Sequence, residues 1–298
     1  MAWSTEVYSS AMQIKRRVRA LGELLDAVEA IRFTWQVKNS KELFFRGEGR
    51  DYGDTKLRPS LYRPLSGFAL KSPADLIEIE DDLFRRFLHG STDLTDESTD
   101  DRWADYFLMQ HSLAPTRLLD WSDGALVALH FALRAEHAEP KERFAYVLDP
   151  YWLMEYISAE NGDHELARRA WLDYCRRHPS KQLDEDDWDG IYLPDEDGHD
   201  ELPIPNFPLV LEFDHFTRRV SAQRSQFILM GTDPEFFSRL LEKDETRIAT
   251  ITIEKDSVAG MRVALRDAGI TESVIYPDLD GLGPELKRLW IERLREPS

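Results

Sequence analysis

The segment Gly124–Leu133, GALVALHFAL, constrains the fold of this chain more than any other. It is apolar on nearly every side of a helical wheel, and a helix that is hydrophobic all round is buried. The segment before it, MQHSLAPTRLLDWSD at Met109–Asp123, is rich in polar side chains. Arg117 and Asp120 therefore lie just before the start of a buried helix, where an unpaired charge costs several kcal/mol. We expect these side chains to pair with each other as a local clamp, or with a ligand.

The composition predicts a globular cytoplasmic protein. The chain has 298 residues, of which 42% are hydrophobic and 11% aromatic, enough for one large domain or two modest ones. It lacks the apolar run of about 18 residues that a membrane span needs, and its N-terminal stretch lacks the apolar core of a signal peptide. The single cysteine, Cys175, excludes a framework of intramolecular disulfides and fits a reducing compartment. We expect no membrane partner.

The net charge of −18 disfavours nucleic acid as a partner. A duplex-binding surface needs Lys and Arg to neutralise phosphates, and repulsion from the rest of the chain would oppose binding. Two basic clusters, Lys15–Arg19 and Arg168–Arg177, are short enough to be solvated helix faces.

Hydrophobic periodicity predicts an α+β fold of mainly antiparallel small sheets surrounded by helices. Helices are expected at 21–33, 73–88 with Ser72 as N-cap, 102–111, 151–178 in two pieces, 235–242, 256–269 and 285–295. Strands are expected at 42–46, 143–148, 209–213, 226–230 and 247–253. Residues 150–205 are expected to be a helical insertion, in which 184–201 carries ten acidic residues and no Lys or Arg.

Several common site motifs are absent from the sequence. Gly47, Gly49 and Gly53 have the spacing G-x-G-x-x-x-G, which is not the dinucleotide fingerprint, and they favour a tight turn with positive φ. The acidic stretch DEDDWDG places Trp188 where a calcium loop needs a ligand. One cysteine and no H-E-x-x-H motif give no zinc site, and no G-x-S-x-G elbow is present. We therefore expect no metal.

Five polar residues lie within apolar or turn-like sequence: Arg46, Arg63, Arg117, Asp120 and Gln223. Arginine has five donors in a fixed fork, so these side chains could serve only to bind loop carbonyls and one another. Guanidinium groups that converge on one pocket would instead bind a phosphate or a carboxylate.

These residues, in this order, resemble the FRG domain family, named after a Phe-Arg-Gly signature. The resemblance covers about residues 20–290, as a single domain spanning the chain, with the acidic insertion outside it. It rests on five blocks: Phe45-Arg46-Gly47, Leu57 to Arg63, Gln110-His111 through Thr116 to Trp121 and on to Ala132, Arg219 to Phe227, and Gly269 to Leu282. Ser225 stands where the family pattern has a glycine.

The resemblance implies a bacterial or phage-associated protein, with a role in defence or as a toxin. The order of the blocks is similar to that of ADP-ribosyltransferases, which implies NAD as substrate. By that analogy Arg46, Asp120 and Gln223 are the catalytic residues, although Gln223 carries no carboxylate. The residues expected to bind NAD or another nucleotide or phosphorylated ligand are Arg46, Arg63, Gln110, His111, Thr116 and Arg117.

Two alternatives to such an enzyme remain open at this point. The chain could be a non-catalytic sensor of a nucleotide or metabolite, or a module that binds a protein partner, because no well-placed catalytic carboxylate stands out in the sequence. It could also be a hydrolase that acts on another substrate.

Overall fold

The computed structural model describes residues 14–69, 71–91, 101–137, 139–161, 163–181, 184–194, 202, 204–211 and 218–295. Within them one mixed sheet of seven strands forms the centre of the fold, in the order β1-β7-β4-β2-β3-β6-β5. The strands are β1 (Lys15–Val18), β2 (Phe44–Glu48), β3 (Leu118–Ser122), β4 (Arg143–Leu148), β5 (Leu209–Leu211), β6 (Ser225–Leu229) and β7 (Ile248–Ile253). β1 and β7 run parallel, and the other neighbouring strands run antiparallel.

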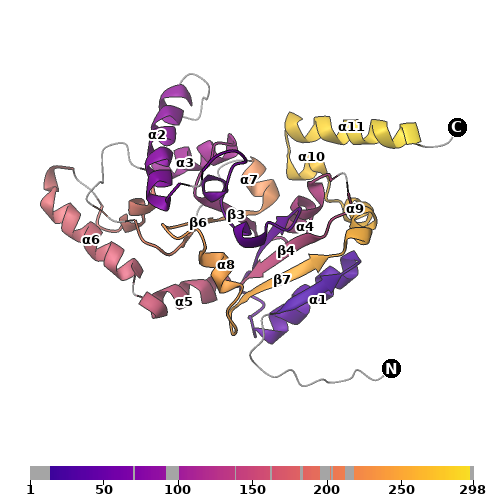
Figure 1. The fold of residues 1–298 in the computed structure, drawn as a ribbon, viewed down its shortest axis with the longest axis horizontal. Coiled ribbons are helices and arrows are strands. Elements are labelled where there is room, and N and C mark those ends of the chain that lie inside the picture. Colours follow the sequence, from indigo (N-terminus) through magenta and orange to yellow (C-terminus); the bar gives the residue numbers. More distant parts are fainter. Residues whose placement is uncertain are drawn as a thin grey trace.

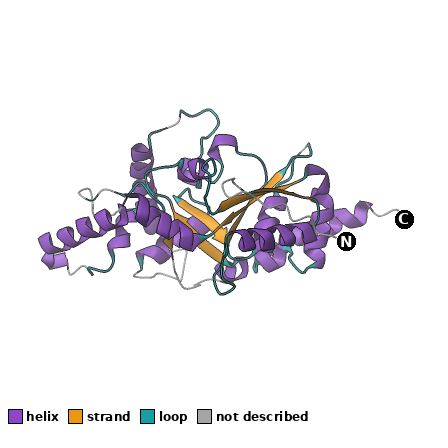
Figure 2. Ribbon diagram, turned by 90° about the horizontal axis from the view of Figure 1, so that it is seen from below, coloured by secondary structure: helices purple, strands orange, loops and turns teal. Residues whose placement is uncertain are grey.

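Helices cover both faces of this sheet, as Figure 2 shows. They are α1 (Leu21–Thr34), α2 (Pro73–Ser91), α3 (Arg102–His111), α4 (Ala125–Arg134), α5 (Pro150–Asn161), α6 (Asp163–Arg177), α7 (Arg218–Gln223), α8 (Phe236–Leu240), α9 (Val258–Asp267), α10 (Glu272–Ile275) and α11 (Leu279–Arg295). The α+β class and the mainly antiparallel pairing are confirmed, but the strands form one sheet in place of several small ones.

The core divides between the two faces according to the alternation of side chains along the strands. Ala145 and Val147 of β4 pack with α1, α4 and α9 in one apolar cluster, whereas Tyr146 and Leu148 belong to a second cluster with α5 and α8. Because β4 is central and covered on both sides, nearly all of its side chains are buried, as its uninterrupted apolar sequence indicates.

The helix α4 occupies the position that its sequence predicts. Six of its side chains, on several sides of the helix, are buried. Gly47 of β2 permits its close approach, because a Cβ at that position would lie 1.9 Å from the carbonyl oxygen of Ala128. A Cβ added to Gly49, two residues further along, would likewise lie 2.5 Å from the Ala135 side chain. Of the three glycines Gly47, Gly49 and Gly53, only Gly53, with φ of +56°, has the left-handed conformation expected of a turn glycine.

Most of the expected elements are found within a few residues of their expected bounds, and Ser72 caps α2 by accepting from the main-chain N–H of Asp75 at 3.2 Å. Strands β1 and β3 and helix α7 were not expected. The segment 150–205 supplies α5 and α6, which lie at the left of Figure 1. Helix α6 has a small apolar cluster of its own with described residues of the segment 188–202, whereas α5 packs into the second main cluster. Residues 212–213, expected as strand, lie outside the described residues, as does 195–201 of the acidic stretch.

Candidate functional site

Strands β2 and β3 part from each other at the centre of the sheet. The two strands form a single residue pair, Phe45 opposite Ser122, although both strands are described in full. Beyond this couple the Arg46 side chain bridges the strands, because its Nη1 donates a hydrogen bond to the main-chain carbonyl oxygen of Asp120. A guanidinium thus satisfies a carbonyl that a regular ladder would pair with a backbone N–H.

A cavity of about 510 Å³ opens beside this division, and we call it the strand-split pocket. Its walls come from β2, β3 and α4, from the end of α3, from α7 and from Tyr276 just after α10. Six of the eight residues expected from the sequence to form the site line it together: Arg46, Arg63, Gln110, His111, Asp120 and Gln223. The tertiary structure therefore gathers residues from four separate blocks of the sequence around one cavity.

The first cationic group of the pocket consists of Arg46 and Arg63 around the buried Glu48. Arg46 Nε lies 3.7 Å and Arg63 Nη2 lies 3.9 Å from the same carboxylate oxygen, which also accepts the main-chain N–H of Leu57 at 3.1 Å. Burial lowers the pKa of Arg63, and repulsion from Arg46 lowers it further. Two guanidinium groups share one carboxylate here, so their positive charge is only partly neutralised. Such a pair favours the binding of an anion.

A second cationic group of the lining was not expected from the sequence. The guanidinium carbons of Arg134 and Arg219 each lie 4.5 Å from the centroid of the Tyr276 ring. Arg134 also donates to the Tyr276 hydroxyl at 2.7 Å and lies 3.4 Å from a carboxylate oxygen of Glu272. With these, four arginines and two carboxylates line the pocket, so it is positively charged in a chain of net charge −18.

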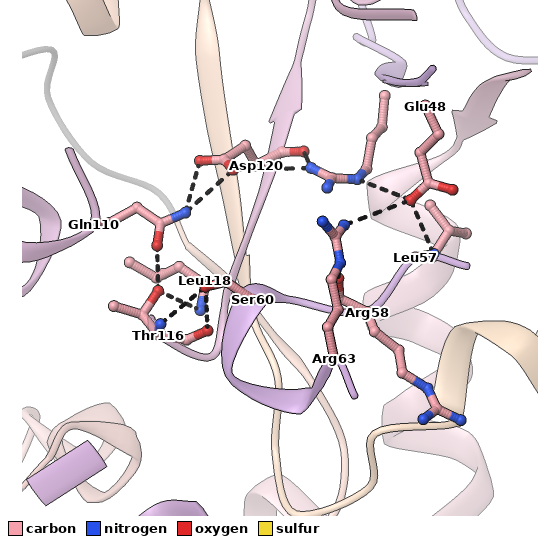
Figure 3. A network of polar contacts seen from close by, with 10 residues as sticks. Glu48, Leu57, Arg58, Ser60, Arg63, Gln110, Thr116, Leu118 and Asp120 are labelled. Atoms are coloured by element: carbon pink, nitrogen blue, oxygen red, sulfur yellow. Dashed lines mark hydrogen bonds and ion pairs between the residues drawn. The ribbon is translucent and has the colours of Figure 1, made fainter. Parts of the chain in front are cut away.

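Asp120 is held in the pocket by a relay of side chains (Figure 3). Thr116 donates its hydroxyl proton to the amide oxygen of Gln110, and the amide nitrogen of Gln110 donates to both carboxylate oxygens of Asp120 at 3.1 Å. Because the Thr116 bond fixes which way the amide points, Gln110 must present its NH₂ group to Asp120. The Asp120 side chain is still 53% exposed, so one side of the carboxylate faces the cavity.

Two residues of the pocket lining, His111 and Trp121, contain buried ring nitrogens without a partner in the described part of the chain. His111 Nε2 and Trp121 Nε1 are buried and have no hydrogen-bond partner among the described residues. Burial lowers the pKa of His111, and the neighbouring Arg219 lowers it further against the opposing effect of Asp120. The ring is therefore neutral near pH 7. Buried polar atoms of this kind are rare, and a bound ligand or water commonly satisfies them.

Arg117 lies outside the pocket and belongs to the core. It is fully buried, and its Nε is paired with the equally buried Glu80 of α2. Its other donors bind the main-chain carbonyls of Met230, at 3.3 Å, and Tyr192, while Tyr106 donates to Glu80. Burial opposes the charged form of Arg117, but Glu80 outweighs this and keeps the pKa above its usual value. The expected pair with Asp120 is therefore wrong, because Glu80 takes its place.

Thr116 is also fully buried and reaches the pocket only through Gln110. The residues that the sequence reasoning did not assign to the site are Glu48, Tyr52, Arg134, Arg219 and Tyr276. A signal existed for two of them, since Arg219 and Tyr276 fall in the blocks that carry the family resemblance. Arg134 ends a buried helix, where a basic side chain is also expected merely to interact with the helix dipole.

The turn before β6 explains why Ser225 is compatible with the fold. Ser225 has ordinary strand geometry opposite Ser122, while the left-handed conformation falls on Arg224, with φ of +49°. Arg224 pairs with Asp123, and Ser122 Oγ donates to the main-chain carbonyl of Gln223 at 2.9 Å. These contacts fix the end of α7, from which Gln223 faces the pocket.

The described residues contain no cluster of three or more His, Cys, Asp or Glu side chains that could bind a metal ion. Nor does the described part of the chain contain a helix long and apolar enough to cross a membrane.

Comparison with known proteins gives one match. The model of the FRG domain matches residues 41–141, a range that contains β2, α2, α3, β3 and α4. No curated protein and no solved structure matches the chain. The matched range supplies Arg46, Arg63, Gln110, His111 and Asp120 of the pocket, whereas Arg219, Gln223 and Tyr276 lie outside it.

Proposed function

We propose that this chain, which carries an FRG domain at residues 41–141, binds NAD in the strand-split pocket and cleaves its nicotinamide–ribose bond. The observation that carries the proposal is the convergence of Arg46 and Arg63 on one shared carboxylate, beside the exposed carboxylate of Asp120. This arrangement combines an anion site with an acidic group, which a nucleotide glycosidic reaction needs. The pocket volume of about 510 Å³ lies within the range of small-molecule and cofactor sites.

The two cationic groups suit the two kinds of contact that a dinucleotide requires. Arg46 and Arg63 would bind the pyrophosphate, because paired guanidinium groups match phosphate oxygens in geometry and charge. Tyr276 with Arg134 and Arg219 offers an aromatic surface and a second positive charge to the other end of the ligand. His111 Nε2, which lacks a protein partner in the part of the chain that the structure describes, would hydrogen-bond a polar edge of the ligand.

The chemistry assigned to Asp120 is stabilisation of positive charge on the ribose. When the bond between C1′ and the nicotinamide nitrogen breaks, its electron pair leaves with neutral nicotinamide and the ribose becomes an oxocarbenium ion. A carboxylate nearby stabilises that ion electrostatically. Water then attacks C1′ and loses a proton to solvent, which gives ADP-ribose and nicotinamide; an acceptor nucleophile in place of water gives transfer of ADP-ribose. Gln223 can orient that nucleophile by hydrogen bonding but cannot take its proton.

The binding part of the proposal is tested by calorimetric titration with NAD, ADP-ribose, ATP and inorganic phosphate. We expect NAD to bind the wild type and Arg63→Ala to weaken the binding by at least tenfold. Arg169→Ala, which removes a 69% exposed arginine on α6, is the matched control and should bind as the wild type does. Equal NAD affinity of all three proteins would refute the assignment of the pocket.

The catalytic part is tested by measuring released nicotinamide with the wild type and Asp120→Asn. Asparagine keeps the shape and can still contact Gln110, but it loses the negative charge. We expect Asp120→Asn to bind NAD and to release nicotinamide at least a hundredfold more slowly, the order of magnitude of losing one electrostatic contact to a transition state. Release at an unchanged rate by this variant would exclude Asp120 from the reaction.

A non-catalytic nucleotide sensor is the second candidate, and one observation favours it. Both carboxylates of the pocket already have protein partners. Asp120 accepts a hydrogen bond from Gln110, and Glu48 lies near two arginines and accepts the main-chain N–H of Leu57. A sensor would bind NAD or ADP-ribose with the same dependence on Arg63 and release no nicotinamide. The two measurements above therefore separate the candidates.

A role as a toxin or defence effector would follow from consumption of cellular NAD or from modification of a target. Expression of the wild type in a bacterial host should then arrest growth, and expression of Asp120→Asn at the same level should not. Arrest by both proteins would point to an activity that does not depend on the Asp120 carboxylate.

A further inference from the structure

The C-terminal helix α11 turns its apolar side chains away from the rest of the protein. Six of these are between 42% and 82% exposed, and we call them the leucine face: Leu279, Leu282, Leu286, Leu289, Trp290 and Leu294. They recur mostly three and four residues apart and so lie on one side of the helix. An amphipathic helix of a globular protein normally buries this side.

The opposite side of α11 contacts the protein through small and polar residues. A Cβ added to Gly281 would lie 2.0 Å from the carbonyl oxygen of Tyr276, so the start of α11 fits closely against the end of α10. Glu285 accepts the main-chain N–H of Ser273 at 3.0 Å. Figure 1 shows α11 next to α10 at the edge of the molecule. The orientation of α11 is thus fixed by polar contacts, and its apolar side is the one left toward solvent.

We propose that the leucine face binds the leucine face of a second copy of this chain, with the two α11 helices antiparallel. Apolar residues at alternating spacings of three and four are the pattern by which helices pair along a seam. A contiguous exposed apolar surface of this kind marks an interaction site.

The order of charges along α11 selects a second copy and the antiparallel direction. The first half carries Asp280 and Glu285 and no basic residue, whereas the second half, from Lys287, carries four basic residues and one acid. Antiparallel pairing places the acidic start of each helix beside the basic end of the other, and Asp280 near Arg293 of the second copy. Parallel pairing would instead place like charges together.

The charge of the remaining chain supports pairing through this helix over other surfaces. The net charge of −18 makes two copies repel each other. The α11 sequence has four basic and three acidic residues, so contact through it is the least opposed by that repulsion.

The mass of the full chain in solution tests the proposal. Sedimentation equilibrium over a series of concentrations should give twice the 34.7 kDa of one chain at the higher concentrations. The double variant Leu286→Glu, Leu289→Glu should remain a monomer throughout, with an unchanged circular dichroism spectrum. Phe33→Glu adds a charge at an apolar position on α1 that is 84% exposed, and should dimerise as the wild type does. If the double variant fails to fold, Leu286→Asn alone should raise the dimer dissociation constant at least tenfold.

The direction of pairing is tested by cysteine cross-linking in a Cys175→Ser background. A mixture of chains carrying Leu279→Cys and chains carrying Leu294→Cys should form a disulfide between the two kinds of chain. Chains of either kind alone should not form an intermolecular disulfide. A wild type that is a monomer at every concentration would overturn the proposal and assign the leucine face to another protein. Cross-linking of Leu279→Cys chains with one another would overturn the antiparallel arrangement.

Discussion

Arg46 joins the two strands that divide at the centre of the sheet, since its guanidinium donates to the main-chain carbonyl oxygen of Asp120. The same side chain lies 3.7 Å from the buried Glu48 carboxylate. Arg46 is therefore part of the pocket wall and part of the sheet. Its removal is expected to affect stability as well as ligand binding, and the two effects can be separated.

Arg46→Met should lower the free energy of unfolding by about 1.5–3 kcal/mol, the usual contribution of a hydrogen bond to a charged group. Arg63→Met should cost less, because Arg63 is 30% exposed and its Nε bonds to a local carbonyl, that of Arg58, at 2.9 Å. Denaturant unfolding of both variants measures the difference. An equal loss in both would mean that the bridge between β2 and β3 does not contribute to stability.

Glu80→Gln and Arg117→Met should each destabilise the fold by about 3–5 kcal/mol, because each leaves a buried charge without its partner. The control is Arg86→Met on the same helix as Glu80, where the partner Asp82 is half exposed; it should change stability by less than about 1 kcal/mol. Ligand affinity of the folded Glu80→Gln protein should equal that of the wild type. A loss of affinity without a loss of stability would place Arg117 in the site after all.

Gly47→Ala should destabilise the protein by about 1–3 kcal/mol or more, because its Cβ would lie 1.9 Å from a backbone oxygen of α4 and the helix would have to move. Gly22→Ala is the matched control. That glycine lies in the first turn of α1 with no atom within 4 Å of the added Cβ, and alanine there should stabilise by up to about 1 kcal/mol. Thermal unfolding of the two variants should therefore shift in opposite directions. A shift in the same direction would contradict the close packing of α4 on β2.

His130 should make stability fall as the pH decreases below 6.5. Burial, and to a smaller extent repulsion from Arg134, lowers the pKa of its ring from 6.5 to about 4. Glu272 lies 3.5 Å from Nε2, but Arg134 lies near the same oxygen, so burial dominates. Between these pH values the unfolded chain takes up a proton that the folded protein does not, and this favours unfolding.

The stability of the wild type relative to His130→Gln should accordingly decrease by about 2 kcal/mol between pH 7.5 and pH 5, at 1.36 kcal/mol per unit of pKa difference. Urea unfolding at the two pH values measures it, and the comparison cancels the titration of other groups. A constant difference between the two proteins would show that His130 has the same pKa in both states.

Thr116→Val should slow the proposed reaction without weakening NAD binding. Thr116 does not touch the pocket, but its hydroxyl fixes the amide of Gln110 and thereby the position of Asp120. We expect kcat to fall about tenfold and KM to stay within a factor of two, with Thr116→Ser restoring kcat. A proportional change in both constants would indicate a general loss of structure.

The sequence predicted the local structure of this chain well because local signals determine it. The periodicity of 21–33, the polar caps and the continuous apolar run of 144–148 each depend on residues close together, and α1 and β4 have nearly the expected bounds. Strand β3 was missed because Leu118–Ser122 carries an aspartate and a tryptophan between a proline and a glycine. The sequence LLDWS does not alternate apolar and polar residues throughout and so lacks the full period-2 pattern of a half-buried strand.

The site was predicted in part for a related reason. Polar residues within apolar sequence indicate that a polar side chain is needed there, and four of the five such residues do line the pocket. The sequence does not show whether such a side chain binds a ligand or pairs with another group in the core. Arg117 stands three residues before Asp120, yet the alternation of side chains on β3 and the approach of α2 bring it to Glu80.

Glu80 itself left a faint signal, because it lies on the same helical face as Leu76 and Phe84, where an acidic residue is out of place. The sequence by itself thus determined most of the helices and strands, that 124–133 is buried, and that a set of arginines and polar residues is distinct from the surface. The tertiary structure alone decided which partner each charge has and which charges share a cavity. The reason is physical: a buried charge is stabilised by whichever opposite group is nearest in space, and distances across a sheet and between packed helices do not depend on separation along the chain.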